Sequence, residues 1–244
     1  MRRRFFFLTA LALLIIAATS YYLLQSPKAS PPRVASKSQP AAFNKKQYSL
    51  TDPSSPWIIV NKHRPLQPKD YAPRDLVTPS IALRTDGMQV RQVTATALQT
   101  MFAAATHDQI GLKLSSGYRS YAYQVNLYAG YVQKQGQAGA DSLSARPGYS
   151  EHQTGWAADI SAANGSCTLQ QCFATTPAGK WLAANAYKYG FIIRYGAGQQ
   201  SVTGYASEPW HVRYVGLPLA AQIHSQGNTT LEQFFKLDPA PDYQ

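Results

Sequence analysis

Hydrophobic side chains recur at intervals of three or four residues in two segments of the middle of the chain, which is the spacing of one face of an α-helix. The first helix is predicted from Val90 to about His107, with a buried face formed by Val93, Ala97, Met101 and Ala105. The second is predicted to begin after Ser120, a favourable N-cap residue, and to end at Gly136. Its buried stripe is expected to consist of Tyr121, Val125, Tyr128 and Val132.

Three shorter helices are indicated by the signals at their ends. One begins at Thr176-Pro177, with proline in the first helical position, and stops at Gly190. A second extends from Pro218 to Ser225. The last has a capping box offered by Thr229, Thr230, Glu232 and Gln233.

Four short apolar runs predict β-strands at residues 112–116, 156–160, 191–193 and 210–215, and a further strand-like run at residues 57–60 marks the start of the folded domain. In the second of these runs Trp156, Ala158 and Ile160 share one face, so Asp159 points to the other. Helices and strands are mixed without a regular βαβ alternation, which predicts an α+β fold.

The sequence contains no glycine-rich phosphate-binding loop, and nucleotide chemistry is therefore excluded.

The first 56 residues have a different character. Arg2, Arg3 and Arg4 precede an apolar run at residues 5–24, which predicts a signal peptide or membrane anchor helix over residues 1–24. A membrane span needs about 20 apolar residues, and this length favours a retained anchor over a signal cleaved near residues 18–20. The positive flank places the rest of the chain outside the cytoplasm. Residues 25–56, rich in Ser, Pro, Ala, Lys and Gln, predict a flexible linker, and residues 57–244 the folded domain.

The formal net charge is +11, from 23 Lys and Arg against 12 Asp and Glu. Such a balance indicates an anionic partner. The basic residues do not form one stripe with interleaved aromatic side chains, and many lie in the first 75 positions. An anionic bacterial envelope therefore suits the charge better than a nucleic acid.

The chain has two cysteines, Cys167 and Cys172. Outside the cytoplasm, a close pair of this kind predicts a disulfide that closes a small loop. Zinc ligation by these thiols is disfavoured because no further cysteine or closely spaced histidine completes a set of four ligands.

Two short segments carry the residue types of a hydrolytic zinc site: residues 150–159 (SEHQTGWAAD) and 208–211 (EPWH). His152, Asp159 and His211 supply three ligands, which leaves a fourth position for water, and Glu208 remains as a base. In a regular strand Glu208 and His211 would point to opposite faces. Pro209 must therefore mark a bend if both side chains face the metal.

These segments follow residues 116–120 (SGYRS) and Gln124 in an order that resembles VanY-like D-alanyl-D-alanine carboxypeptidases, zinc peptidases of the lysostaphin, D-Ala-D-Ala metallopeptidase and hedgehog group. Residues 60–62 and 181–192 also look like that family, and the resemblance covers about residues 57–235. It implies a small antiparallel sheet that carries the zinc site and is flanked by helices.

The resemblance also implies roles for single residues. One zinc ion per chain would be held by His152, Asp159 and His211, with Glu208 as the base that assists attack by zinc-bound water. Arg119 would hold the oxyanion, and the positions that contact the substrate would be Ser150 and Gln124.

The implied reaction is removal of the terminal D-alanine from peptidoglycan stem peptides by a monomer that is membrane-anchored or secreted in the bacterial envelope. A peptidoglycan endopeptidase and a non-catalytic wall-binding module are the alternatives. A penicillin-sensitive serine enzyme is disfavoured because neither Lys180 nor Lys188 has the Ser-x-x-Lys spacing. The choice between pentapeptide (DD) and tetrapeptide (LD) substrates stays open.

Overall fold

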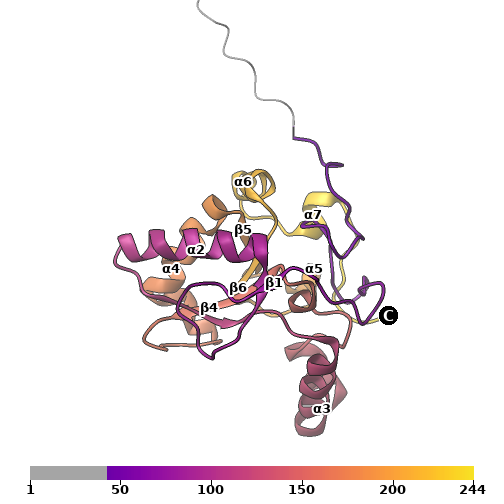
Figure 1. Cartoon of the computed structure of the whole chain (residues 1–244). Helices are drawn as coiled ribbons and strands as arrows, with labels where there is room; N and C mark the ends of the chain where they lie inside the picture. Colours follow the sequence, from indigo (N-terminus) through magenta and orange to yellow (C-terminus); the bar gives the residue numbers. More distant parts are fainter. Residues whose placement is uncertain (1–42) are drawn as a thin grey trace, which may run out of the picture. The chain divides into compact units, whose positions relative to one another are not determined.

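The computed structural model describes residues 43–244, which form one compact unit (Figure 1). The signal or anchor helix expected at residues 1–24, and the linker up to residue 42, lie outside the described residues. Within residues 43–244, no helix is both long and apolar enough to span a membrane. Residues 43–56, which the composition assigns to the linker, pack on the domain. The Phe43 ring stacks on that of Trp57 at a centroid distance of 5.4 Å, and Lys45 Nζ donates to the carbonyl of Phe234 at 2.6 Å.

The centre of the fold is a four-stranded antiparallel sheet with the strand order β3-β4-β6-β5. Its members are β3 (Leu112–Ser116), β4 (Ala157–Ala162), β5 (Phe191–Tyr195) and β6 (Glu208–Tyr214). Alternation along β4 and β6 sends Ala158, Ile160 and Val212 into the main hydrophobic core. A separate two-stranded sheet pairs β1 (Leu76–Val77) with β2 (Val90–Arg91). The predicted α+β class is confirmed.

Helices α2 (Gln92–His107) and α4 (Pro177–Asn185) contribute the other side of this core. The length predicted for α2 is confirmed to within two residues, but its predicted buried face is wrong in part. Val93 is 48% exposed, and the fully buried residues include Ala95 and Leu98 instead. The buried face of α2 is rotated about the helix axis relative to the predicted face. It includes Thr94, a polar residue that a pattern of apolar positions does not count.

Helix α3 (Tyr121–Leu143) projects from the rest of the domain (Figure 1). Ser120 caps it as predicted, and its hydroxyl accepts from the amide of Tyr123 at 3.1 Å. Gly136 does not end the helix: it adopts φ 71° inside it, and helical structure resumes up to Leu143.

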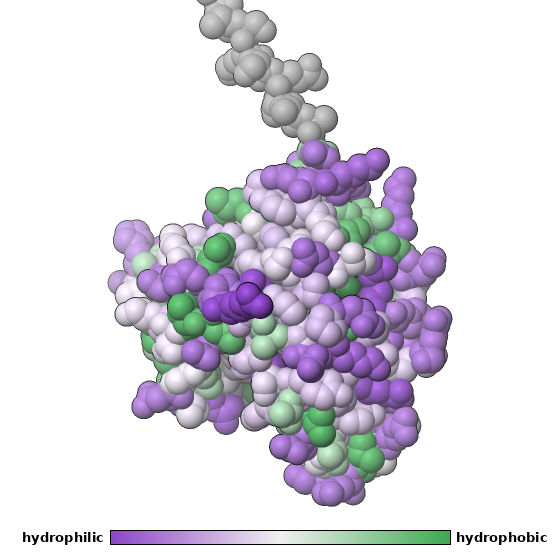
Figure 2. Space-filling view, turned by 45° about the vertical axis from the view of Figure 1, so that its right-hand side comes forward, coloured by the Kyte–Doolittle hydropathy of each residue, from purple (hydrophilic) through white to green (hydrophobic). Residues whose placement is uncertain are grey.

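The buried stripe predicted for α3 is also wrong, because only Gln124 and Ala140 of this helix are buried and Val125 is 39% exposed. A projecting helix has few neighbours to cover its apolar side. In Figure 2 hydrophobic side chains are visible on this protruding part, whereas most of the face shown is hydrophilic.

The remaining predicted helices are α6 (Leu217–Ser225) and α7 (Leu231–Phe235), which pack with Trp57 and Ile59 in a second hydrophobic cluster. The capping box of α7 is confirmed for Thr230 and Gln233. Single turns complete the chain: η1 (Glu151–Thr154), η2 (Gln171–Thr175), η3 (Ala186–Tyr189) and α5 (Gln200–Thr203). The third predicted helix therefore consists of α4 followed by η3, and Gly190 ends it with φ 84°.

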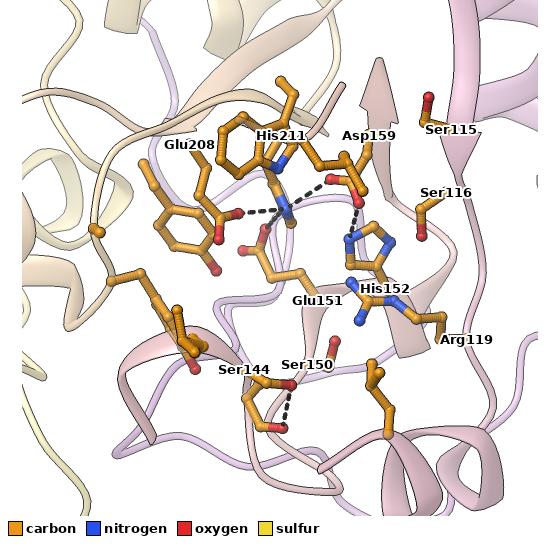
Figure 3. A pocket seen from close by; sticks show the side chains of 18 of the residues that line it. Ser115, Ser116, Arg119, Ser144, Ser150, Glu151, His152, Asp159, Glu208 and His211 are labelled. Carbon is orange, nitrogen blue, oxygen red and sulfur yellow. Dashed lines mark hydrogen bonds and ion pairs between the residues drawn. The ribbon is translucent and has the colours of Figure 1, made fainter. Parts of the chain in front are cut away.

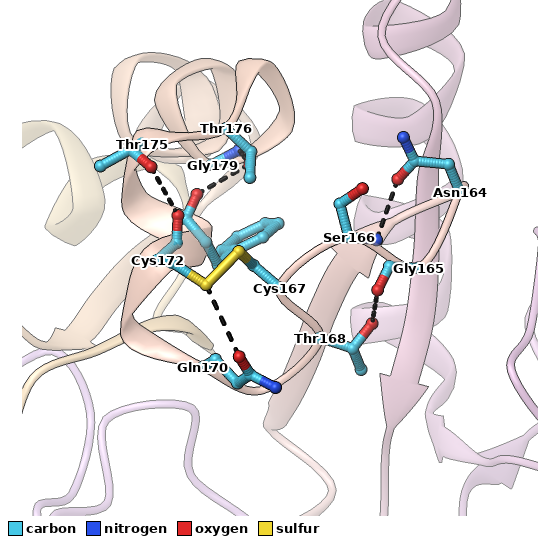
Figure 4. Close-up of a disulfide and its surroundings, with 11 residues drawn as sticks. Asn164, Gly165, Ser166, Cys167, Thr168, Gln170, Cys172, Thr175, Thr176 and Gly179 are labelled. Carbon is cyan, nitrogen blue, oxygen red and sulfur yellow. Dashed lines mark hydrogen bonds between the residues drawn. A yellow bond between two sulfur atoms is a disulfide. The ribbon is translucent and has the colours of Figure 1, made fainter.

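The predicted disulfide between Cys167 and Cys172 is confirmed, with an S–S distance of 2.08 Å (Figure 4). It closes a loop between β4 and α4. Within this loop Thr168 Oγ1 donates to the carbonyl of Gly165 at 2.9 Å, and Thr175 Oγ1 donates to that of Cys172 at 2.8 Å. The bridge and these local hydrogen bonds shape a segment that has little regular structure of its own.

Candidate metal centre

Asp159 of β4 and His211 of β6 are direct partners in the antiparallel pairing of these two strands. They occupy the side of the sheet opposite to Ala158 and Val212, which lie in the hydrophobic core. His211 Nδ1 and Asp159 Oδ1 are 3.4 Å apart. The register of the sheet thus brings two candidate ligands together.

His152 comes from η1, just before β4. Gly155 ends this turn with φ 72°, and a side chain there would meet Arg91 Cγ at 2.7 Å, so the tight return into the strand suits glycine. His152 Nδ1 lies 2.7 Å from the carbonyl oxygen of Gly117 and can only donate to it. In the neutral ring Nε2 is therefore free of a proton, and it faces Asp159 Oδ2 at 3.3 Å (Figure 3).

The three residues each offer one ligand atom within 4.8 Å of the others, and all three side chains are buried. Two of the polar atoms at their centre, His152 Nε2 and Asp159 Oδ1, are buried without a hydrogen-bond partner among the described residues. Buried polar groups in proteins are normally paired. Two imidazoles and one carboxylate are a donor set that suits zinc with one position left open. The residues therefore fit the metal that the sequence predicts.

Glu208 reaches the same cluster through an irregularity in β6. Ile193 pairs with Val212 and Tyr195 with Glu208, so two residue steps on β5 oppose four on β6. This irregularity, which spans Pro209, accompanies a distance of 3.4 Å between Glu208 Oε2 and His211 Nδ1. The predicted bend is confirmed, and the carboxylate lies beside the ligands.

The charges of the cluster follow from burial and from neighbouring groups. Burial, followed by the positive charge of Arg119, lowers the pKa of His152 to about 4. Burial would also lower the pKa of His211, but the surrounding carboxylates, Asp159 first, raise it well above the ordinary value. Burial would raise the pKa of Asp159, yet the two histidines hold it well below its usual range. A bound cation would replace the proton on His211, since ligating imidazole must be neutral.

Arg119 lies next to the cluster, and its backbone amide donates to the carbonyl of His152 at 3.2 Å. Its Nη1 donates to Gln124 Oε1 at 3.3 Å, while its Nε is buried without a partner among residues 43–244. Gln124 is fully buried and does not line the cleft. Its amide nitrogen instead donates to Ser144 Oγ at 3.0 Å and to the carbonyl of Ala145 at 2.7 Å. Gln124 thus holds the Arg119 side chain from a buried position outside the cleft lining.

The cluster lies in a cleft of about 460 Å³, which Ser150 also lines. One wall comes from α3 and another from the disulfide loop, through Leu169 and Gln171. The aromatic lining residues are Tyr123, Tyr131, Tyr195, Tyr205 and Trp210. A cleft with flat apolar rings, hydroxyls and the guanidinium groups of Arg84 and Arg119 can hold a short polar chain with a terminal carboxylate.

Sequence reasoning missed Glu151, although it is adjacent to His152. Its side chain is fully buried and contacts His211, with Nε2 of the histidine 3.3 Å from Glu151 Oε2. It also missed Arg194 and Arg213, which pair with Glu151. A signal was present, because each arginine stands between apolar and aromatic neighbours in the sequence (FIIRY at residues 191–195 and VRYV at residues 212–215), and a buried cation needs an anionic partner.

Comparisons with known proteins agree with this geometry. The family of VanY D-alanyl-D-alanine carboxypeptidases matches residues 87–217. YodJ of Bacillus subtilis, which is named as a carboxypeptidase, is 41% identical over 192 residues that cover 77% of this chain and 70% of YodJ. The structure of the LD-carboxypeptidase LdcB is 41% identical, with a TM-score of 0.72, over 75% of this chain and 87% of LdcB. A structure of the D,D-pentapeptidase VanY in complex with Zn(II) is 32% identical, with a TM-score of 0.61, over 72% and 97% of the two chains.

The fold and the matches define a carboxypeptidase of the zinc-peptidase fold. The chain belongs to the VanY family of D-alanyl-D-alanine carboxypeptidases. It is therefore an enzyme, and its family acts on peptidoglycan.

Proposed function

We propose that this protein is a zinc-dependent carboxypeptidase that removes the terminal D-alanine from peptidoglycan stem peptides. The observation that carries the proposal is the convergence of His152, Asp159 and His211, with Glu208 alongside. Two buried atoms of this cluster have no hydrogen-bond partner in the part of the chain that the structure describes. A non-catalytic wall-binding module would not need a base beside its metal ligands.

His152, Asp159 and His211 would hold the metal, and zinc, when bound, acts as a Lewis acid that activates water and polarises the scissile carbonyl. Glu208 accepts a proton from the attacking water and later returns it to the amine of the leaving D-alanine. Arg119 donates to the carbonyl oxygen as negative charge develops there. Its guanidinium suits this role because it stays protonated and has a buried Nε without a partner among the described residues.

The remaining cleft residues bind the substrate. Ser150 lies in the lining and offers a hydroxyl to the peptide backbone or to the terminal carboxylate. Gln124 holds Arg119 rather than touching substrate. Because mature peptidoglycan lies outside the cytoplasm, the proposed place of action is the bacterial envelope.

The proposed function leaves open whether the enzyme acts on tetrapeptide or on pentapeptide stems. LdcB is named an LD-carboxypeptidase and VanY a D,D-pentapeptidase, and this chain resembles both. Incubation of the full-length, zinc-loaded protein with tetrapeptide stems, pentapeptide stems and cross-linked dimers, followed by mass spectrometry, separates these possibilities. The expected result is the loss of one alanine from a stem peptide. A chelator should abolish this cleavage, and a β-lactam should leave it unaffected. Cleavage only inside cross-linked dimers would identify an endopeptidase, and no cleavage by folded, metal-loaded protein would refute the proposal.

A further inference from the structure

Beneath the metal centre lies a group of four fully buried charged side chains that the reaction itself does not use: Glu151, Arg194, Arg213 and Glu232. Glu151 is the member that touches the metal centre. Both of its oxygens are occupied, and they serve different partners. Oε1 accepts from Arg194 Nε and from Arg213 Nη1, each at 2.8 Å, whereas Oε2 lies 3.3 Å from His211 Nε2.

Each of the two arginines also forms hydrogen bonds with groups other than Glu151. Arg194 forms a double hydrogen bond with Glu232, at 3.0 and 2.6 Å, and Glu232 also accepts from Asn61 at 3.0 Å. Arg213 Nη2 donates to the carbonyls of Pro56 and Ile58 at 3.0 and 2.8 Å. The group has two negative and two positive charges, so it is neutral as a whole, and its position is determined by contacts with three separate parts of the chain.

We propose that Glu151 is a positioning residue for the metal site: it holds the His211 ring with the proton on Nε2, so that Nδ1 is presented to the metal. This inference rests on the proposed function. The geometry supports it because Nδ1 faces Asp159 and Glu208, whereas Glu151 is the one carboxylate of residues 43–244 in contact with Nε2. A carboxylate that accepts from the outer nitrogen fixes the tautomer and orientation of a ligating imidazole and increases its basicity.

The group also explains why an anion can be kept beneath the centre without competing for the metal. Arg213 and Arg194 offset the charge of Glu151, and its Oε1 is turned toward them. Asp159 and Glu208 have no arginine in salt-bridge contact among the described residues, so they remain as the anions that face the metal position.

Glu151→Gln tests the role with a nearly isosteric change. An amide has a single acceptor oxygen, and two arginines compete for it, so the NH2 group is turned toward the N–H of His211 and the hydrogen bond is lost. Glu232→Gln is the matched control. This substitution also removes one negative charge from the buried group and weakens the hydrogen bonds of Arg194. Residue 232, however, does not contact His211.

The zinc dissociation constant of each full-length protein is measured by competition with a chromophoric chelator, at a temperature where circular dichroism shows it folded. Glu151→Gln is expected to weaken zinc binding about 10- to 100-fold, and Glu232→Gln to leave it near wild type. Unchanged affinity in Glu151→Gln, or an equal loss in both variants, would overturn the inference. If wild type itself failed to bind zinc or to cleave stem peptides, the proposed function would fail instead.

A measurement on the wild type keeps the inference testable should Glu151→Gln not fold. In zinc-loaded protein with 15N-labelled histidine, the His211 ring is expected to show a protonated Nε2 and a metal-bound Nδ1. The opposite tautomer would overturn the role of Glu151, even in an enzyme that binds zinc and cleaves its substrate.

Discussion

Asp159 and His211 are paired residues of neighbouring strands, and their Oδ1 and Nδ1 atoms lie 3.4 Å apart. Their separation is therefore set by the register of β4 and β6 and not by a loop. A one-residue slip of either strand would turn one of the two side chains to the hydrophobic core face. A site built on paired strands is rigid, and precise placement of ligands is what a metal of tetrahedral preference requires.

Removal of a ligand should abolish metal binding without unfolding the domain. Asp159→Ala removes both a ligand and a negative charge that faces the metal position. Changes outside the ligand set weaken zinc binding by up to roughly 100-fold, and this variant is expected to lose more than that. Isothermal titration calorimetry measures this. Asp108→Asn, an exposed change outside the cleft, is the control, and equal affinities in the two variants would show that Asp159 is not a ligand.

Arg119→Lys should slow the chemical step. An ammonium group cannot reproduce the guanidinium's hydrogen bonds to both Gln124 and a developing oxyanion, so kcat is expected to fall about 10²- to 10³-fold while zinc affinity stays unchanged. Arg84 also lines the cleft, and Arg84→Lys serves as the control, with kcat near wild type. A change in KM alone for Arg119→Lys would assign Arg119 to substrate binding instead.

Gln124→Ala should affect activity through Arg119. Its removal leaves the partly buried carbonyl of Ala145 without this hydrogen bond, so the free energy of unfolding is expected to fall by about 1–3 kcal/mol. Denaturant unfolding measures that change. Because Arg119 loses its support, kcat should fall as well, at unchanged zinc affinity. Lower stability with a wild-type kcat would mean that Gln124 is structural only.

The disulfide should influence substrate binding as well as stability. Replacing both cysteines by serine opens a small loop, and the chain-entropy model predicts a loss of roughly 2 kcal/mol. KM should rise, because Leu169 and Gln171 of this loop line the cleft, while kcat should change little. Leu169→Ala, which keeps the bridge, separates the two effects. An unchanged KM in both variants would remove the loop from the substrate site.

Much of this fold and site is predictable from the sequence, because the signals involved are local. Ser120 and Thr230 cap helices through their own hydroxyls, and Gly190 adopts a backbone conformation that favours glycine. The four strands follow from short apolar runs. The bend at Pro209 follows from the requirement that Glu208 and His211 meet.

What periodicity could not predict depends on tertiary packing. The apolar side of α3 looks like a buried stripe, yet Val125 is exposed because the helix projects from the domain. Gln124, a polar residue of that helix, is fully buried because it carries three hydrogen bonds beneath Arg119. The partners of Arg194 and Arg213 lie dozens of residues away in the chain, so the buried charged group emerges only when the strands and α7 come together.

The most direct test of the catalytic centre compares wild type with Glu208→Gln, both loaded with zinc and incubated with the stem peptide that the wild type cleaves. Mass spectrometry follows the loss of one alanine, and elemental analysis gives the zinc content. We expect about one zinc ion in each protein, product from wild type, and a rate reduced about 10²- to 10⁴-fold in the variant, the contribution typical of a general base. Cleavage by Glu208→Gln at the wild-type rate, with zinc bound, would contradict the proposed role of Glu208 and with it the mechanism.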